Sequence, residues 1–69
     1  MSNLTIQQRR ELVAQKILQL DREVYMNQLN EKIMIATQAP SEQLDFIREE
    51  IRKANTALSV LEEEMATLQ

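Results

Sequence analysis

The chain of 69 residues lacks cysteine, histidine and glycine, and it contains one proline and two aromatic side chains. Without cysteine there is no disulfide or thiolate metal site, and without histidine the commonest metal ligand and general base is missing. Loops need glycine or proline at special positions, so few loops are expected. At 69 residues the chain is expected to form one domain over residues 1–69. We expect that it is not an enzyme and has no catalytic residue, metal or cofactor.

Long apolar runs and charge of a single sign are also missing. The longest uninterrupted apolar run covers residues 33–36, far short of the ~20 residues that a membrane span needs. Eleven acidic and eight basic residues are interspersed and give a net charge of −3, so no basic stripe is available to follow nucleic-acid phosphates. We expect neither a membrane nor a nucleic-acid partner. The absence of cysteine fits the reducing cytoplasm, which is the expected location.

The last third of the chain carries an unbroken heptad pattern. Its apolar residues recur at alternating spacings of three and four, at Leu44, Ile47, Ile51, Ala54, Leu58, Leu61, Met65 and Leu68. A strand alternates its faces every two residues and cannot use this spacing. The pattern is typical of a helix that packs lengthwise against another helix.

A single break divides the chain into two helices. Thr5 and Gln8 have the spacing of a capping box, so the first helix is expected over about residues 5–37. Pro40 disfavours a helical residue before it, which places the turn at 37–41. A second helix follows at about 41–68, with Ser41 expected to supply its cap. Two long helices joined by so short a turn predict an all-α, antiparallel two-helix hairpin.

The first helix has two apolar stripes. Val13, Ile17, Leu20 and Val24 form one stripe, whose continuation meets the polar residues 27 and 31. A second stripe lies on nearly the opposite side. A hairpin has only one internal face, and the sequence leaves open which stripe occupies it. The residues expected to remain exposed and to bind a partner are Leu18, Tyr25, Leu29, Ile33, Phe46 and Val60.

The antiparallel register predicts specific neighbours. With the turn near residue 39, position i lies roughly opposite position 78 − i. This places Leu58 and Leu61 opposite Leu20 and Ile17, in the core of the hairpin. It also brings Glu31 near Arg48. At the other end of the hairpin, the basic residues Arg9, Arg10 and Lys16 are expected near the acidic residues 62–64.

Two segments of the second helix resemble a known family. The run Ser41-Glu42-Gln43-Leu44-Asp45-Phe46-Ile47, followed by Ala57-Leu58-Ser59-Val60-Leu61, is similar to the small co-chaperones of type III secretion needle proteins, the YscE/EscE type. The resemblance covers about residues 38–61. The family often has glycine at the turn, where this chain has Gln38-Ala39-Pro40. The resemblance implies a hairpin that binds a helical-repeat, TPR-like chaperone, the two together holding a needle subunit in the cytoplasm before export.

Two other functions remain open from the residues alone. The spare apolar stripe could be covered by further copies of the chain, which would make a self-assembling structural bundle, a homo-oligomer. It could also belong to an inhibitor or a ligand-sequestering oligomer of the kind that phages encode.

Overall fold

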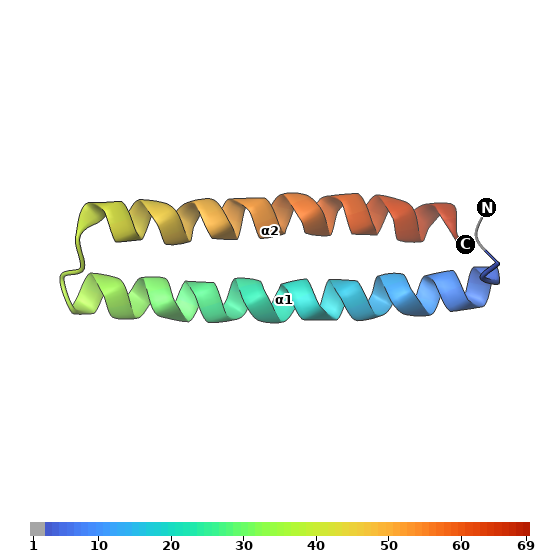
Figure 1. The fold of residues 1–69 in the computed structure, drawn as a ribbon, viewed down its shortest axis with the longest axis horizontal. Helices are drawn as coiled ribbons and strands as arrows, with labels where there is room; N and C mark the ends of the chain where they lie inside the picture. Colours follow the sequence, from blue (N-terminus) through green and yellow to red (C-terminus); the bar gives the residue numbers. More distant parts are fainter. Residues whose placement is uncertain (1–2) are drawn as a thin grey trace.

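The described part of the chain folds as two antiparallel helices (Figure 1). The computed structural model describes residues 3–69, with α1 at Ile6–Ala36 and α2 at Ser41–Thr67. The described residues contain no strand, and the rod that they form measures 49 × 17 × 14 Å. The start of α1 and the end of α2 lie at one end of the rod, and the turn lies at the other. The predicted all-α hairpin and the position of its turn are confirmed.

A capping box starts α1. The Thr5 hydroxyl accepts a hydrogen bond from the Gln8 backbone N–H at 3.1 Å, and the Gln8 side-chain oxygen accepts one from the Thr5 N–H at 2.9 Å. These bonds satisfy two of the donors that every helix leaves unpaired at its N-terminus. The long first helix therefore begins where the sequence predicts.

A Schellman motif ends α1. The Ala39 N–H donates to the Met34 carbonyl at 2.8 Å, and the Gln38 N–H donates to the Ile35 carbonyl at 3.2 Å. The backbone of Gln38 has a φ of 58°, which lies in the left-handed region. Glycine usually fills this position because it has no Cβ to clash with the backbone. The turn is therefore made by a residue that is poorly suited to its backbone conformation.

Pro40, and not Ser41, occupies the N-cap position of α2. Its φ of −58° and ψ of 148° precede the first helical residue, and no side chain caps this terminus. The expectation that Ser41 would supply the cap is wrong, because Ser41 is already inside the helix. Glu42 in the first turn places a negative charge beside the positive end of the helix dipole.

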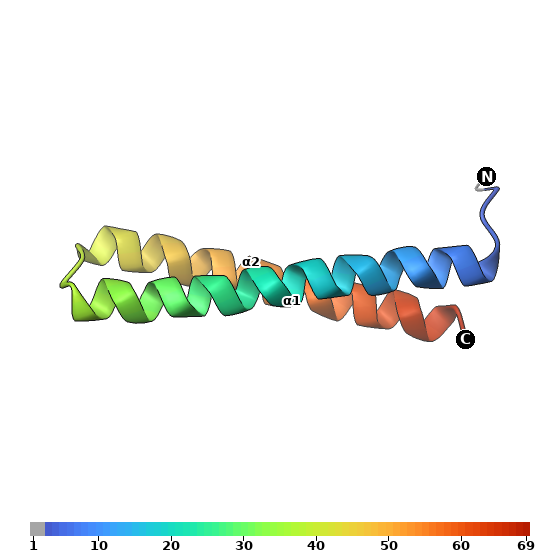
Figure 2. The ribbon, with the colours of Figure 1, turned by 90° about the horizontal axis from the view of Figure 1, so that it is seen from below.

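The eight-residue seam of α2 lies against α1 along its full length. All eight seam residues are buried or half-buried. On α1 the inward residues are Val13, Ile17, Leu20 and Val24, and the same line continues through the half-buried residues 27 and 31. The helices cross at a shallow angle (Figure 2), as coiled-coil packing predicts. The structure thus settles which stripe of the first helix faces inward.

The core of the hairpin is thin. Leu20, Ala54 and Leu58 form its central cluster, and Ile17 and Leu61 pack against them half-buried. The predicted contacts of Leu58 and Leu61 are therefore confirmed. No side chain among residues 3–69 falls below 2% exposure. With little apolar area enclosed, the free energy of unfolding depends on a few contacts.

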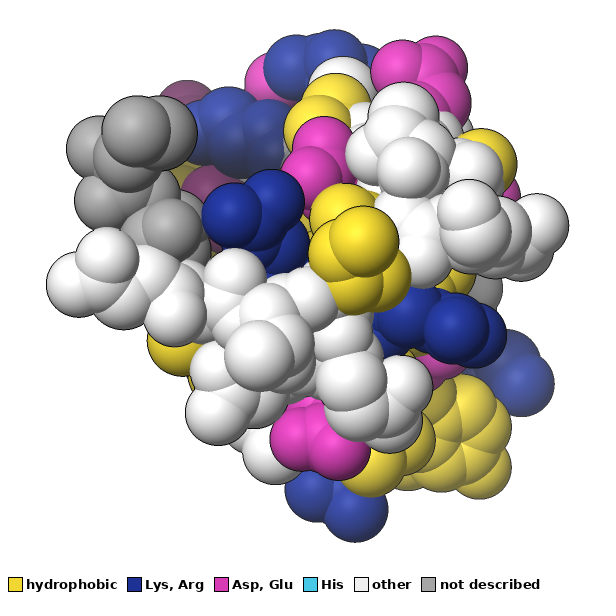
Figure 3. Space-filling view, turned by 90° about the vertical axis from the view of Figure 1, so that its right-hand side faces the viewer, with side chains coloured by type: hydrophobic (Ala, Val, Ile, Leu, Met, Phe, Trp, Pro, Cys, Tyr) yellow, Lys and Arg dark blue, Asp and Glu magenta, His cyan; other side chains and the backbone are white. Residues whose placement is uncertain are grey.

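Charged residues follow the predicted register at one end of the rod only. The Arg48 guanidinium donates from Nε to Oε2 of Glu31 at 2.6 Å, which confirms that pair. Basic and acidic side chains both gather at the end that carries the termini (Figure 3). However, Arg9, Arg10 and Lys16 form no ion pair with residues 62–64 in the described chain, so pairs of this kind do not hold that end together.

Replacement of Leu58 by alanine tests the core. Leu58→Ala should lower the free energy of unfolding by about 2–5 kcal/mol, because it leaves a cavity in the central cluster. Since a domain of this size is only marginally stable, the isolated chain should lose most of its helical circular dichroism at 25 °C. The matched control is Val60→Ala, two residues away and 60% exposed, which should leave the melting curve nearly unchanged. Equal effects of the two changes would contradict this description of the core.

Glycine at the turn should stabilise the hairpin. Gln38→Gly removes the Cβ clash at positive φ, a cost of about 1–2 kcal/mol, and adds about 0.5–1 kcal/mol of unfolded-state entropy. The net gain should be about 0.5–1 kcal/mol in thermal or urea unfolding. The same substitution in the exposed interior of α1, Gln28→Gly, should destabilise by about 0.5–1 kcal/mol. A loss of stability from Gln38→Gly would show that the turn is relaxed with glutamine.

Candidate functional site

Five of the six residues predicted to bind a partner are exposed. Leu18, Tyr25, Ile33, Phe46 and Val60 have between 51% and 65% of their surface in contact with solvent. Leu29 differs, because it is half-buried. It nevertheless lies on the side of α1 that faces away from α2, where residues three and four positions away on the same helix can cover it. The prediction of full exposure was wrong for Leu29.

The residues on α1 form one continuous surface. At 100° per residue, Leu29 lies almost opposite the inward line of Val24 and residue 27, and its apolar neighbours lie within about 60° of it around the helix. Met26, which is 55% exposed, belongs to this surface although it was not among the predicted residues. Its spacing of three from Leu29 and seven from Ile33 was the signal that identifies it. We call this surface the α1 face and define it as Leu18, Arg22, Tyr25, Met26, Leu29 and Ile33.

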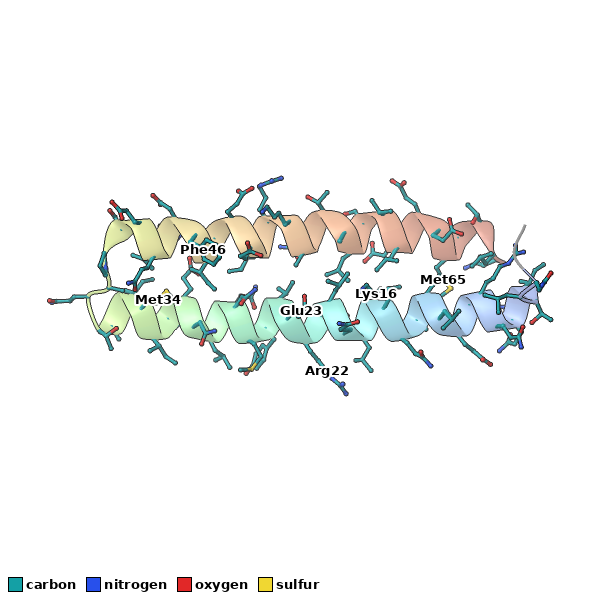
Figure 4. All side chains as sticks on the ribbon, viewed as in Figure 1. Lys16, Arg22, Glu23, Met34, Phe46 and Met65 are labelled. Atoms are coloured by element: carbon teal, nitrogen blue, oxygen red, sulfur yellow. The ribbon has the colours of Figure 1, made fainter. Side chains whose placement is uncertain are left out.

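Arg22 supplies the charge within the α1 face. Its side chain points away from α2, whereas Met34 and Met65 lie between the two helices (Figure 4). The apolar stem of an arginine can cover neighbouring apolar surface while its guanidinium stays in water. The α1 face is therefore apolar apart from Arg22, and the exposed Lys32 lies at its edge, three positions from Leu29.

Phe46 and Val60 do not extend the α1 face. They lie on α2, fourteen positions apart, with the exposed Lys53 halfway between them on the same line. Residues seven positions apart share a line along a helix. The structure thus separates the six predicted residues into a surface on α1 and two isolated apolar side chains on α2.

The outer surface of α2 is charged and internally paired. Arg52 donates to Glu49 through Nε at 2.9 Å and through Nη2 at 2.6 Å, and Lys53 Nζ lies 3.8 Å from Oε1 of Glu50. The hydrogen bond from Arg52 holds the pKa of Glu49 below its usual value, and the same bond raises the pKa of Arg52. Because these charges are hydrated and already have partners, an apolar partner gains little by covering them.

A shallow hollow lies between the helices beside the core. Its lining residues are Leu20, Glu23, Asn27, Glu50, Lys53, Ala54 and Ala57. The small side chains of Ala54 and Ala57 leave space that the polar Asn27 does not fill. Ordinary packing accounts for this hollow, because two alanines on one helix face a short polar residue on the other.

Two other kinds of functional element are absent from the described residues, a metal-binding cluster and a membrane-spanning helix. Within residues 3–69, no group of three or more acidic side chains is arranged to hold a metal ion. Neither helix of the described chain has the length and apolarity to cross a membrane.

Comparison with known proteins adds no relative: no family model matches the chain, and no curated protein or solved structure matches it either.

An apolar side chain at position 27 should fill the hollow. Asn27→Leu should raise the free energy of unfolding by about 1 kcal/mol, because it adds apolar contacts at a half-buried seam position. Urea unfolding measures the change. Asn30→Leu, an exposed position on the same helix, is the matched control and should change stability by less than about 0.5 kcal/mol. If Asn27→Leu destabilises the hairpin, the hollow is not available to a larger side chain.

Proposed function

We propose that this hairpin is a small non-catalytic co-chaperone, or adaptor, that binds and stabilises a larger helical-repeat chaperone in the cytoplasm. The pair would keep a type III secretion needle subunit soluble before export. The observation that carries the proposal is the α1 face, an apolar surface that the fold of the hairpin does not cover. Monomeric proteins seldom leave a contiguous apolar surface in water, and such surfaces are typical of protein-binding sites.

The shape of the α1 face favours a helical partner. Its residues follow the spacing i, i+4, i+7 and i+8 along one side of a straight helix, from Leu18 to Met26. An amphipathic helix of this kind binds by placing its apolar side in a groove between other helices. Helical repeats offer such grooves, because each repeat is itself a pair of packed helices.

The apolar residues of the two segments that resemble needle co-chaperones lie on different sides of α2. Of the apolar residues in the two similar segments, Leu44, Ile47 and Leu58 lie in the interface with α1, whereas Phe46 and Val60 point to solvent. These segments therefore combine positions that hold the hairpin together with positions that are free for a partner. This division suits an adaptor that folds before it binds.

The size of the α1 face is sufficient for a specific complex. Removing a Leu- or Ile-sized side chain from water contributes about 1.5–3 kcal/mol. Four or five such side chains outweigh the cost of association, which is of the order of 4–15 kcal/mol, only when the fit is good. Tyr25 and Leu29 lie at the middle of the face, where the residues that dominate binding are usually found.

A charge at the middle of the α1 face should abolish binding. Leu29→Glu places a carboxylate where the partner's apolar groove would close, and a desolvated carboxylate without a partner is strongly unfavourable. The variant should keep the helical circular dichroism of the original chain, because Leu29 lies on the side away from α2. Co-expression with a tagged helical-repeat chaperone from the source genome, followed by affinity purification, measures the loss of binding.

The matched control is Thr56→Glu, which adds the same charge at an exposed position on the outer side of α2. It should co-purify with the chaperone as well as the original chain does. Retained binding by Leu29→Glu would contradict the assignment of the α1 face. Unfolding of Leu29→Glu would show that this side of α1 belongs to the internal packing.

A further inference from the structure

The hollow between the helices has an apolar floor and a charged rim. Its floor is made by the core residues Leu20 and Ala54 and by the half-buried Ala57. Its rim carries two carboxylates and one ammonium group, so the net charge of the lining is −1. Packing explains why this space exists, and the lining decides which group it can hold. A side chain with an apolar stem and a positive end suits such a lining, because the stem covers the floor while the charge stays at the rim.

Two polar groups of the rim are free to bind a positive end. Within residues 3–69 the Glu23 carboxylate forms no ion pair, and the half-buried Asn27 amide forms no hydrogen bond. Lys53 Nζ lies 3.8 Å from Oε1 of Glu50, which is too far for a hydrogen bond, and 39% of the Glu50 side chain remains exposed. A guanidinium has five N–H donors and can donate to carboxylate and amide oxygens at once. The rim therefore offers acceptors that match an arginine.

Two exposed apolar side chains flank the hollow on α2. Phe46 precedes the rim residue Lys53 by seven positions and Val60 follows it by seven, so each lies about 10 Å from it along one line of the helix. They are 65% and 60% exposed. A helix lying along α2 turns nearly the same side towards it every seven residues. Such a helix can therefore meet Phe46, the hollow and Val60 with three residues at i, i+7 and i+14.

We propose that the surface running along α2 from Phe46 across the hollow to Val60 binds a helix of a partner protein that presents an apolar residue, an arginine and an apolar residue at seven-residue spacing. The stem of the arginine covers the apolar floor, and its guanidinium donates to Glu23 and to the carbonyl oxygen of Asn27. We call this the Phe46–Val60 surface. It is separate from the α1 face and does not depend on the proposed function.

Charge decides the central residue of the partner helix. A glutamate there would face the two carboxylates of the rim, and like charges at close range oppose association. A leucine would cover the floor but would remove Glu23 and Asn27 from water without giving them a partner, which is unfavourable. The pairs at the rim stay partly hydrated, so the arginine supplies a preference and the burial of Phe46 and Val60 supplies most of the affinity.

Three stapled helical peptides of about 20 residues test the proposal with the hairpin alone. They differ only at a central arginine, leucine or glutamate, and each carries a leucine seven residues before and after it. In fluorescence anisotropy the arginine peptide should bind at least about tenfold more tightly than the glutamate peptide and about threefold more tightly than the leucine peptide. High salt should reduce the first ratio, because it screens charges near the surface. The proposal is overturned if the leucine or glutamate peptide binds as tightly as the arginine peptide, or if no binding occurs up to about 1 mM.

Variants of the rim test which residues select the arginine. Glu23→Lys should reverse the order of the arginine and glutamate peptides. Glu63→Lys makes the same charge change at an exposed position that does not line the hollow, and it should leave the order unchanged. Asn27→Leu fills the hollow and should remove the preference for arginine over leucine while the helical circular dichroism is kept. An unchanged order with Glu23→Lys, an equal effect of Glu63→Lys, or a preference retained by Asn27→Leu would contradict binding of the arginine in the hollow.

A final pair of variants tests the choice of surface. Phe46→Ser should weaken binding of all three peptides at least about threefold, whereas Tyr25→Ser, which lies on the α1 face and is 61% exposed before substitution, should weaken none. The reverse result would show that the peptides bind the α1 face and would overturn the proposal. No chaperone is present in these measurements. A failure of the Phe46–Val60 surface would therefore leave the co-chaperone function standing, and that function is tested separately by Leu29→Glu.

Discussion

A single helix–helix interface provides the tertiary packing of the described residues, 3–69. The seam of α2 meets one side of α1, and Leu20, Ala54 and Leu58 are enclosed at its centre. In this part of the chain no second layer covers the other sides of either helix, so residues outside the interface are exposed or shielded by their own helix. The apolar α1 face exists because the interface can use only one side of a helix that is apolar on two.

The choice between the two stripes of α1 shows where sequence reasoning stops. The stripe that continues through Asn27 and Glu31 looks the poorer partner for an apolar seam, yet it is the one that faces α2. Two features allow these polar side chains to lie in the interface. The Glu31 carboxylate lies near the turn, where it reaches Arg48 and remains partly hydrated, and Asn27 lies opposite small alanine side chains. Such compensation depends on residues of the other helix, which periodicity along one helix cannot reveal.

Other features were predictable to different degrees. The unbroken spacing of the α2 seam and the lone proline were sufficient for the hairpin, its register and the pair between Glu31 and Arg48. The cap of α2 was not predictable from composition, because Ser41 and Pro40 are both good residues for the start of a helix and only the backbone angles distinguish them. The exposed positions on α1 followed from helical geometry. The partial shielding of Leu29 depends on how the side chains beside it on α1 are placed, which the spacing of apolar residues does not give.

The tight turn has a consequence for the order in which the hairpin forms. Contacts next to the turn join residues that are close in sequence, whereas contacts at the far end join residues almost a full chain length apart. Closing a short loop costs less entropy than closing a long one, so pairing should begin beside the turn and proceed towards the termini. When the hairpin opens, the contacts should be lost in the opposite order. The end that carries both termini should separate first, and its amide protons should exchange with solvent soonest.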